Sequence, residues 1–363
     1  MKTFIIQPDM RLYGGAEILI VRLANYLIKK GVDVEILTLS IDDRIKNDLN
    51  KNIKIVTIFK KYFNKNYLYY LGLAKLKKYL RNNYENINCV ANPHNFPAEY
   101  LPIPFAKNIV WMCNEPPMPI YFYNTPFSKF KILDRFLVRK YIKYSIVSDD
   151  FNAERFEKIY GIKPKIINYG IDYEFFSHGS RKKMREFILI QVGTITPLKN
   201  QIESVKVVEK LKSKIPNIKL LLVGWAEEKY EKFLMNYIKK KKLEKYIEFT
   251  GNLDREKVRE LYKISDVAIF PVKSQGGWLS PFEALSSGVP IIVSRELTCK
   301  DIIIKNDLGI VTNNFSDAIL KIYENKKLYE RKVRKARTWI KKNLSWDNFS
   351  KKMLEVFEEA IRR

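Results

Sequence analysis

Residues 274–290 read SQGGWLSPFEALSSGVP, and they follow an apolar run with the composition of a buried parallel strand. Gly276 and Gly277 would let the backbone approach a ligand closely. Ser280-Pro281 fits the N-cap and first position of a helix, and that helix would carry Glu283. The stretch therefore predicts an α/β unit in which free N–H groups at a helix N-terminus bind an anion such as a phosphate. A tight turn whose glycines serve packing alone is the alternative.

Short apolar strands alternate with helical periodicity along the whole chain, which is typical of doubly wound α/β domains. In the first half, the predicted strands are 4–6, 34–37, 53–58, 89–91, 109–112 and 145–148, with a helix at about 16–30. After Gly170 the pattern restarts with strands at 187–192, 219–223, 247–250 and 267–270, and helices at about 199–214, 227–243 and 254–264. We therefore predict two Rossmann-like domains, residues 1–172 and 185–340, with the charged stretch 177–183 in the linker.

The chain is strongly basic. Its 363 residues include 66 Lys and Arg against 40 Asp and Glu, which gives a net charge of +26. Such a charge attracts a protein to phosphates on a membrane surface, a nucleic acid or a nucleotide-linked substrate. The excess is divided almost equally between the two halves, so it defines no single nucleic-acid-binding face. A lysine-rich composition on solvated surfaces is the alternative explanation.

The cysteines Cys89, Cys113 and Cys299 are odd in number and far apart, so neither a disulfide framework nor a zinc site is indicated. No stretch approaches the roughly 18 apolar residues that span a bilayer, and the apolar run at the N-terminus is too short for a signal peptide. We expect a cytoplasmic protein that would meet a membrane only as a peripheral protein at its inner face.

Glycine-containing loops follow the first strand of each predicted domain. The run GGAE at 14–17 stands at the start of a helix, and VGTITPLK at 192–199 follows the first strand of the second domain. Ligands of such sheets bind beyond the carboxyl ends of the strands, so the two loops would face one cleft. Lys199 would neutralise a diphosphate there, and the amides of Gly14 and Gly15 would add uncharged donors.

Together these motifs resemble the retaining nucleotide-sugar glycosyltransferases of the GT-B fold, specifically glycosyltransferase family 4 (group 1). The family's order and spacing are kept over nearly the whole chain by GGAE at 14–17, INYGID at 167–172, VGTITPLK at 192–199, LVG at 222–224, FTG at 249–251, the block 275–290 and SW at 345–346. The resemblance implies two Rossmann-like domains that face a central cleft, with a C-terminal helix, residues 345–363, that returns to the first domain.

The resemblance also implies a nucleoside-diphosphate sugar as the donor. Glu283 matches the second carboxylate of the family's Glu–seven residues–Glu motif and would accept hydrogen bonds from the ribose hydroxyls. Lys199 matches the diphosphate-binding lysine, and His94 resembles the histidine near the reacting centre. The predicted catalytic set is therefore His94, Lys199 and Gln275, although a core or capping histidine is the alternative for His94. Further donor contacts are expected from Gly14, Gly15, Gly193, Thr194 and Gly276, and from the backbone of Gly277, Trp278 and Leu279.

Three positions depart from the family's pattern. Thr194 replaces an Arg beside the diphosphate, which removes a bidentate phosphate clamp that Lys199 cannot fully replace. Arg295 is one residue that would compensate. Gln275 stands where the family has Glu facing the donor sugar, and Tyr169 stands where it has Asn. A non-catalytic nucleotide-sugar-binding protein is therefore an alternative to an enzyme.

No acidic pair has the spacing of a Mg²⁺ site, so we expect neither a metal nor a cofactor. Lys199 and helix N-termini would instead stabilise the departing diphosphate. The resemblance implies that the transfer retains the anomeric configuration, with attack on the face from which the diphosphate leaves.

Basic and aromatic residues are interleaved in two segments of the predicted first domain. Residues 60–81 contain seven basic and no acidic side chains, and residues 127–144 contain six basic and one acidic. This composition is typical of a surface that rests on an anionic membrane, and it favours a lipid-linked or glycan acceptor. Inward-facing aromatics and a nucleic-acid acceptor are the alternatives. Asn114 and Glu115 are the predicted acceptor wall.

Overall fold

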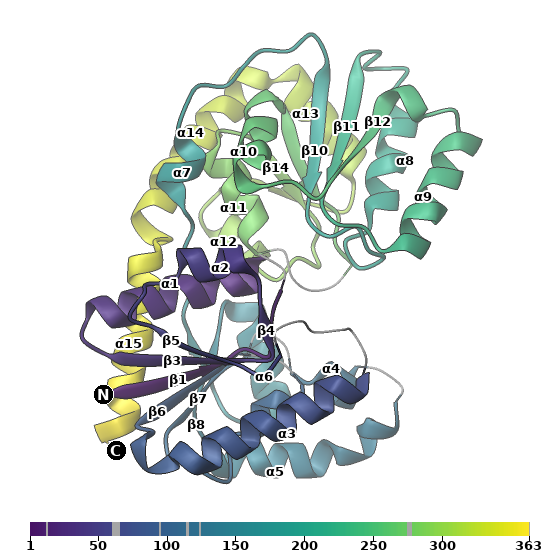
Figure 1. Cartoon of the computed structure of the whole chain (residues 1–363). Coiled ribbons are helices and arrows are strands. Elements are labelled where there is room, and N and C mark those ends of the chain that lie inside the picture. Colours follow the sequence, from purple (N-terminus) through teal and green to yellow (C-terminus); the bar gives the residue numbers. More distant parts are fainter. Residues whose placement is uncertain are drawn as a thin grey trace. The chain divides into compact units, whose positions relative to one another are not determined.

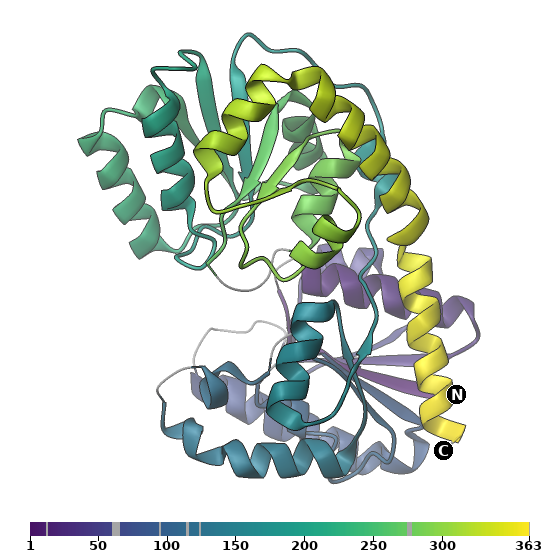
Figure 2. The ribbon, with the colours of Figure 1, turned by 180° about the vertical axis from the view of Figure 1, so that it is seen from behind.

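A computed structural model of the chain describes residues 1–11, 14–59, 66–93, 96–113, 116–122, 125–273 and 278–362. The chain divides into two compact units, and each has a parallel sheet flanked by helices (Figures 1 and 2). Unit 1 comprises Met1–Gly170 and Trp346–Arg363, and unit 2 comprises Ile171–Ser345. In the described part of the chain, no helix combines the length and the apolar composition that crossing a bilayer requires.

Unit 1 is built on a seven-stranded sheet in the order β5-β3-β1-β6-β7-β8-β9. The strands are β1 (Lys2–Ile6), β3 (Asp33–Thr38), β5 (Lys54–Thr57), β6 (Cys89–Pro93), β7 (Ile109–Met112), β8 (Ile142–Val147) and β9 (Lys165–Ile166). Strand order runs outward from β1 in both directions, as doubly wound sheets require. A separate short parallel pair is formed by β2 (Asp9–Met10) and β4 (Ser40–Ile41).

Helices cover both faces of this sheet because the crossovers from β1 run toward opposite edges. Phe4, Val90 and Ile109 are register partners across β1, β6 and β7 and share one face. On that face, leucines of α3 (Asn66–Asn83) pack against the first two, and Val138 of α5 (Lys131–Tyr141) packs with Ile109. On the opposite face, α1 (Gly15–Lys29) packs against α15 (Trp346–Arg362) (Figures 1 and 2).

The remaining helical segments of unit 1 are short and lie in the connections. They are α2 (Asp43–Asp48), η1 (Tyr84–Asn86), η2 (Ala98–Tyr100), α4 (Met118–Tyr121), η3 (Pro126–Phe130) and α6 (Asp150–Tyr160). The ends of α6 follow local sequence rules. The Asp149 side chain accepts a hydrogen bond from the Asn152 N–H at 2.9 Å, and Gly161 ends the helix with φ +65°.

Unit 2 has a six-stranded parallel sheet in the order β12-β11-β10-β13-β14-β15. The strands are β10 (Phe187–Val192), β11 (Ile218–Val223), β12 (Ile247–Gly251), β13 (Val267–Phe270), β14 (Ile291–Val293) and β15 (Ile310–Val311). The helices are α7 (Tyr173–Ser177), α8 (Gln201–Leu211), α9 (Glu228–Lys240), α10 (Arg255–Ile264), α11 (Leu279–Ser286), α12 (Lys300–Lys305), α13 (Phe315–Glu324) and α14 (Lys326–Asn343), with a short turn η4 (Glu244–Tyr246). The central strands are mostly apolar because helices cover both of their faces, with Gln191 of β10 as a buried polar exception.

The prediction of two doubly wound α/β domains is confirmed, and so is the return of the C-terminal helix to the first of them. The predicted start of α11 is wrong. The helix begins at Leu279 with Trp278 as its N-cap, so Ser280 and Pro281 are the second and third helical residues. A proline is tolerated there because the N–H groups of a first helical turn have no intrahelical acceptor.

Candidate functional site

The carboxyl ends of β10, β11 and β12 are each followed or closed by a glycine with positive φ: Gly193 (+145°), Gly224 (+145°) and Gly251 (+72°). Backbone hydrogen bonds join them, from Gly193 N to Val223 O at 2.9 Å and from Gly224 N to Gly251 O at 3.0 Å. A Cβ placed on Gly224 would lie 2.2 Å from the Gly193 oxygen. Close backbone approach therefore requires glycine here, and it leaves a surface without side chains at the sheet edge.

Two glutamine side chains form hydrogen bonds with the backbone of the loop after β10, residues 193–200. Gln191 Nε2 donates to Lys199 O at 2.8 Å, and its Oε1 accepts from the buried Ser204 hydroxyl at 2.6 Å. Gln201 Nε2 donates to Thr194 O at 3.0 Å. These bonds fix the loop backbone, so that the Thr194 side chain is exposed and that of Lys199 is partly buried.

The same loop is tied to the segment that follows β13. Asn200 Nδ2 donates to Pro271 O at 2.8 Å, and Lys273 N donates to Leu198 O at 2.9 Å. Lys199 is thus brought beside the chain that enters the glycine stretch. Gln275, Gly276 and Gly277 themselves lie outside the described residues.

Glu283 lies on α11, and its side chain is partly buried. Removal from water raises the pKa of its carboxyl group to about 7, the positive charge of Arg255 opposes this shift, and the negative charge of Asp172 adds to it. Arg255 forms an ion pair with Asp172, and its guanidinium lies 4.8 Å from the ring centroid of Phe175. The carboxyl group of Glu283 is therefore poised to change its protonation state near neutral pH.

Two residues with predicted donor contacts, Trp278 and Leu279, precede Glu283 at the start of α11. The indole of Trp278 is buried, with its ring centroid 4.8 Å from that of Phe282, so it serves packing. Leu279 is partly buried at the first helical position. Tyr262, which is fully buried beneath the helix, donates from its hydroxyl to Ser280 O at 3.2 Å. The first turn of α11 is thus held in place by contacts with the core of unit 2.

In unit 1, Gly14 and Gly15 lie where predicted, at the N-terminus of α1. The Gly14 N–H donates to Glu17 Oε2 at 3.1 Å, which is one half of a capping box, since glycine has no side chain to accept the returning bond. Burial raises the pKa of the Glu17 carboxyl to about 7. Glu17 takes the Gly14 N–H in this structure, and the contact of both glycine amides with a ligand stays a prediction. Gly15 is exposed.

The other unit 1 predictions, His94, Asn114 and Glu115, lie outside the described residues. The strands that lead to them are described. β6 ends at Pro93 and β7 ends at Met112, and these two residues are register partners in the sheet.

Two residues at the unit 2 edge were not predicted. Trp225 directly follows Gly224 and is 54% exposed, and its carbonyl accepts from Ile195 N at 2.8 Å. An aromatic directly after a strand-ending glycine is the signal that would have identified it. Arg255 carries no such signal, because its partner Asp172 is 83 positions away in the chain.

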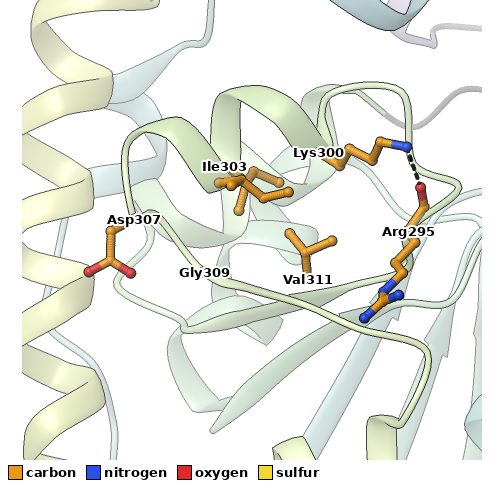
Figure 3. A pocket seen from close by; sticks show the side chains of 7 residues that line it. Arg295, Lys300, Ile303, Asp307, Gly309 and Val311 are labelled. Carbon is orange, nitrogen blue, oxygen red and sulfur yellow. Dashed lines mark hydrogen bonds between the residues drawn. The ribbon is translucent and has the colours of Figure 1, made fainter.

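Arg295, the residue expected to compensate for Thr194, has its own surroundings in unit 2. It follows β14, and Figure 3 shows it beside a cavity of about 470 Å³ between α12 and β15. Lys300 Nζ donates to Arg295 O at 2.8 Å. The cavity is lined by Arg295, Lys300, Ile303, Ile304, Asp307, Gly309 and Val311. Among the residues that the structure describes, no three His, Cys, Asp or Glu side chains form a group that could hold a metal ion.

The chain is similar in sequence to known glycosyltransferases. The chain is 28% identical over 259 residues to the uncharacterized glycosyltransferase MJ1069 of Methanocaldococcus jannaschii, and 24% identical over 171 residues to D-inositol 3-phosphate glycosyltransferase 2 of Catenulispora acidiphila. The matches cover 66% and 41% of this chain. They span less than two thirds of the relatives' own lengths, 63% and 39%.

Solved structures agree over almost the full chain. Sucrose-phosphate synthase from Thermosynechococcus elongatus has a TM-score of 0.81 at 14% identity and covers 99% of this chain and 98% of its own. HepE of Anabaena, in complex with UDP-glucose, has a TM-score of 0.79 at 15% identity and covers 99% and 100%. At such identities the likeness establishes the fold, which is GT-B.

Two family models match the sequence, one described as Glycosyl transferases group 1 over residues 172–360 and one as Glycosyltransferase Family 4 over residues 13–175. The first covers more than half of the chain and contains Lys199, Glu283 and the glycine-lined edge of the unit 2 sheet. The chain belongs to the group 1 glycosyl transferases and has the GT-B fold.

Proposed function

We propose that this protein is a retaining, metal-independent glycosyltransferase that moves a sugar from a nucleoside-diphosphate sugar to a glycan or lipid-linked acceptor. One observation carries the proposal. Hydrogen bonds tie the loop of Lys199 to the segment 271–273, at the sheet edge from which the chain continues to Glu283. A cation, a side-chain-free glycine surface and a carboxylate are what a diphosphate and a ribose diol require.

The donor would bind with its ribose on Glu283. A carboxylate offers two acceptor oxygens, which suit the two neighbouring hydroxyls of a ribose. The diphosphate would lie toward Lys199 and the first turn of α11, whose N–H groups carry partial positive charge. HepE, a structural relative, was solved with UDP and with UDP-glucose, which supports a nucleotide sugar as the ligand.

In the proposed transfer, the bond between the anomeric carbon and the diphosphate oxygen breaks while the acceptor hydroxyl oxygen bonds to the same carbon. The hydroxyl proton passes to the departing diphosphate, which leaves from the face that the acceptor attacks. This retaining course rests on the family resemblance. Lys199 would lower the barrier by stabilising the charge that develops on the diphosphate, because a preorganised donor needs no reorganisation during the reaction.

The remaining roles complete the proposal. His94 and Gln275 would contact the donor sugar, while Asn114 and Glu115 would contact the acceptor. TarM of S. aureus, solved with UDP, α-GlcNAc-glycerol and fondaparinux, supports a glycan as one kind of acceptor. A glycan acceptor and a lipid-linked glycan share the sugar hydroxyl that would attack.

A thermal-shift panel of UDP-, GDP- and ADP-sugars tests the proposal first. A ligand present at 100 times its dissociation constant stabilises the folded state by about 2.7 kcal/mol, so the correct donor raises the melting temperature. Stabilisation by one nucleotide sugar, followed by release of its nucleoside diphosphate, is the expected result. A panel without any stabilisation would contradict the donor site.

A non-catalytic nucleotide-sugar-binding protein is the second candidate. It is favoured by Thr194, whose neutral side chain is exposed at the position where the family has an arginine. The same panel separates the two candidates: donor binding without any release of nucleoside diphosphate would favour the non-catalytic protein.

A further inference from the structure

Helix α5 of unit 1 has an unusual orientation. Its single carboxylate, Asp134, is buried, and it accepts hydrogen bonds from the Tyr100 and Tyr121 hydroxyls, both at 2.5 Å. Its large apolar residues point to solvent: Ile132 is 81% exposed, Leu133 50% and Phe136 52%. A helix on the surface of a water-soluble domain ordinarily buries such residues and exposes its carboxylates.

The packing of α5 prevents a rotation that would bury these apolar residues. Val138, one turn after Asp134, packs in a core cluster with Ile109 and Phe156. Arg139 Nε donates to Tyr160 O at 2.6 Å. Together with the two tyrosine hydroxyls on Asp134, these contacts hold the helix by one face, so the opposite face stays exposed.

The exposed face is continued by the preceding turn η3 and carries only positive charge. Phe127 and Phe130 of η3 are 39% and 40% exposed. Asp134 is the only acidic residue in the stretch 125–143, and it is buried. Exposed cations surround the apolar side chains, with Lys140 Nζ 5.2 Å from the ring centroid of Phe136. The cations are Lys129, Lys131, Arg135 and Lys140.

We propose that η3 and α5 form a docking surface for an anionic membrane. The apolar side chains would enter the boundary between headgroups and acyl chains, and the surrounding lysines and arginines would contact anionic headgroups. A nucleic acid fits this surface less well, because the aliphatic Ile132 and Leu133 offer no ring for stacking on bases. The inference does not depend on the proposed reaction.

Helix α3 adds a smaller set of exposed residues on the same face of the sheet (Figure 1). It belongs to the segment 60–81 that the sequence identified as basic and aromatic, of which residues 60–65 lie outside the described part. The apolar residues of α3 divide between two faces. The core side takes Leu73, Leu76 and Leu80, and the solvent side takes Tyr67, Tyr70 and Leu71. The docking surface therefore centres on η3 and α5, whose five exposed apolar side chains named above outnumber the three of α3.

Sedimentation of the full chain with vesicles tests this surface. Vesicles of phosphatidylglycerol in phosphatidylcholine should bind the protein at low salt, and vesicles of phosphatidylcholine alone should bind it much less. The triple variant Ile132→Ser, Leu133→Ser, Phe136→Ser should lower the partition constant about tenfold or more. The charge variant Lys129→Gln, Lys131→Gln, Lys140→Gln should lower it at least as much.

Helix α9 of unit 2 supplies the matched control. Its Phe233 and Met235 are 50% and 48% exposed among lysines, so Phe233→Ser, Met235→Ser removes comparable apolar surface elsewhere. The control should sediment like the original protein, and all variants should keep its melting temperature because the changed side chains are exposed. Absence of vesicle binding, equal losses in control and α5 variants, or tight binding of duplex DNA that the apolar triple variant retains would each overturn the proposal.

Discussion

At the scale of single residues, donor binding should depend most on the carboxylate of Glu283. Glu283→Ala removes the proposed ribose acceptor and should weaken donor binding by about 1.5–3 kcal/mol, the range for hydrogen bonds to a charged group. Glu283→Gln keeps one acceptor oxygen and should lose less. Calorimetric titration with the best donor measures both, with Glu256→Ala, an exposed residue of α10, as the control. An unchanged affinity in the alanine variant would remove Glu283 from the site.

The raised pKa of Glu283, about 7, predicts a pH dependence of donor affinity. Ribose hydroxyls donate to the ionised carboxylate, so affinity should fall as the pH is lowered through 7. The fall should approach about tenfold per pH unit below the pKa. Glu283→Gln cannot ionise and should show a flatter profile over the same range. An equally steep profile in this variant would assign the titration to another group.

The raised pKa of Glu283 also makes the free energy of unfolding depend on pH. The folded-state pKa lies above the ordinary value of 4.5, so between these values the folded protein binds more protons than the unfolded chain, and stability falls as the pH rises. Relative to the original protein, Glu283→Gln should therefore gain on the order of 1–3 kcal/mol between pH 4.5 and 8. Urea unfolding at both pH values measures the gain, and a constant difference between the proteins would contradict the raised pKa of the Glu283 carboxyl.

At the scale of elements, the glycine-lined strand ends should tolerate substitution unequally. Gly224→Ala would place a Cβ 2.2 Å from the Gly193 oxygen at φ +145°, and it should cost on the order of 2–4 kcal/mol of unfolding free energy. Gly251→Ala is the matched control, because its Cβ would meet nothing within 4 Å and only its φ of +72° is unfavourable. Equal losses in the two variants would mean that the close approach of β10 and β11 is not what requires glycine.

Some helices and strands, or their ends and orientations, could not be predicted from the sequence. The apolar strands of both domains and the helices α1, α8, α9 and α10 were predicted to within a few residues, whereas α13 and α14 had no predicted range. The strands β9, β14 and β15 were not predicted either, since two or three residues carry too little pattern. The cap of α11 was misplaced because Ser280-Pro281 satisfies the local rules for a helix start, although the helix begins at Leu279. The orientation of α5 depends on Asp134 meeting two tyrosines from other segments, and periodicity alone would have turned the helix over.

For the whole molecule, the pair of doubly wound domains followed from the restart of the strand pattern after Gly170, and the divided first unit followed from the family resemblance of the C-terminal helix. The part of the candidate site that could be predicted is the part in which glycines and Lys199 directly follow a predicted strand in the sequence. Trp225 and Arg255 were not predicted, because their place at the site depends on which strand ends and helices lie side by side in unit 2.

The central claim is that Lys199, without a metal, stabilises the departing diphosphate. The most direct test measures release of nucleoside diphosphate from the best donor in excess EDTA, for the original protein, Lys199→Ala and the control Lys206→Ala on the exposed side of α8. Release by the original protein and the control should persist in EDTA, and Lys199→Ala should be slower by roughly two powers of ten, as expected for loss of a preorganised donor. Complete loss in EDTA that Mg²⁺ restores, or a Lys199→Ala rate equal to the control, would contradict the claim.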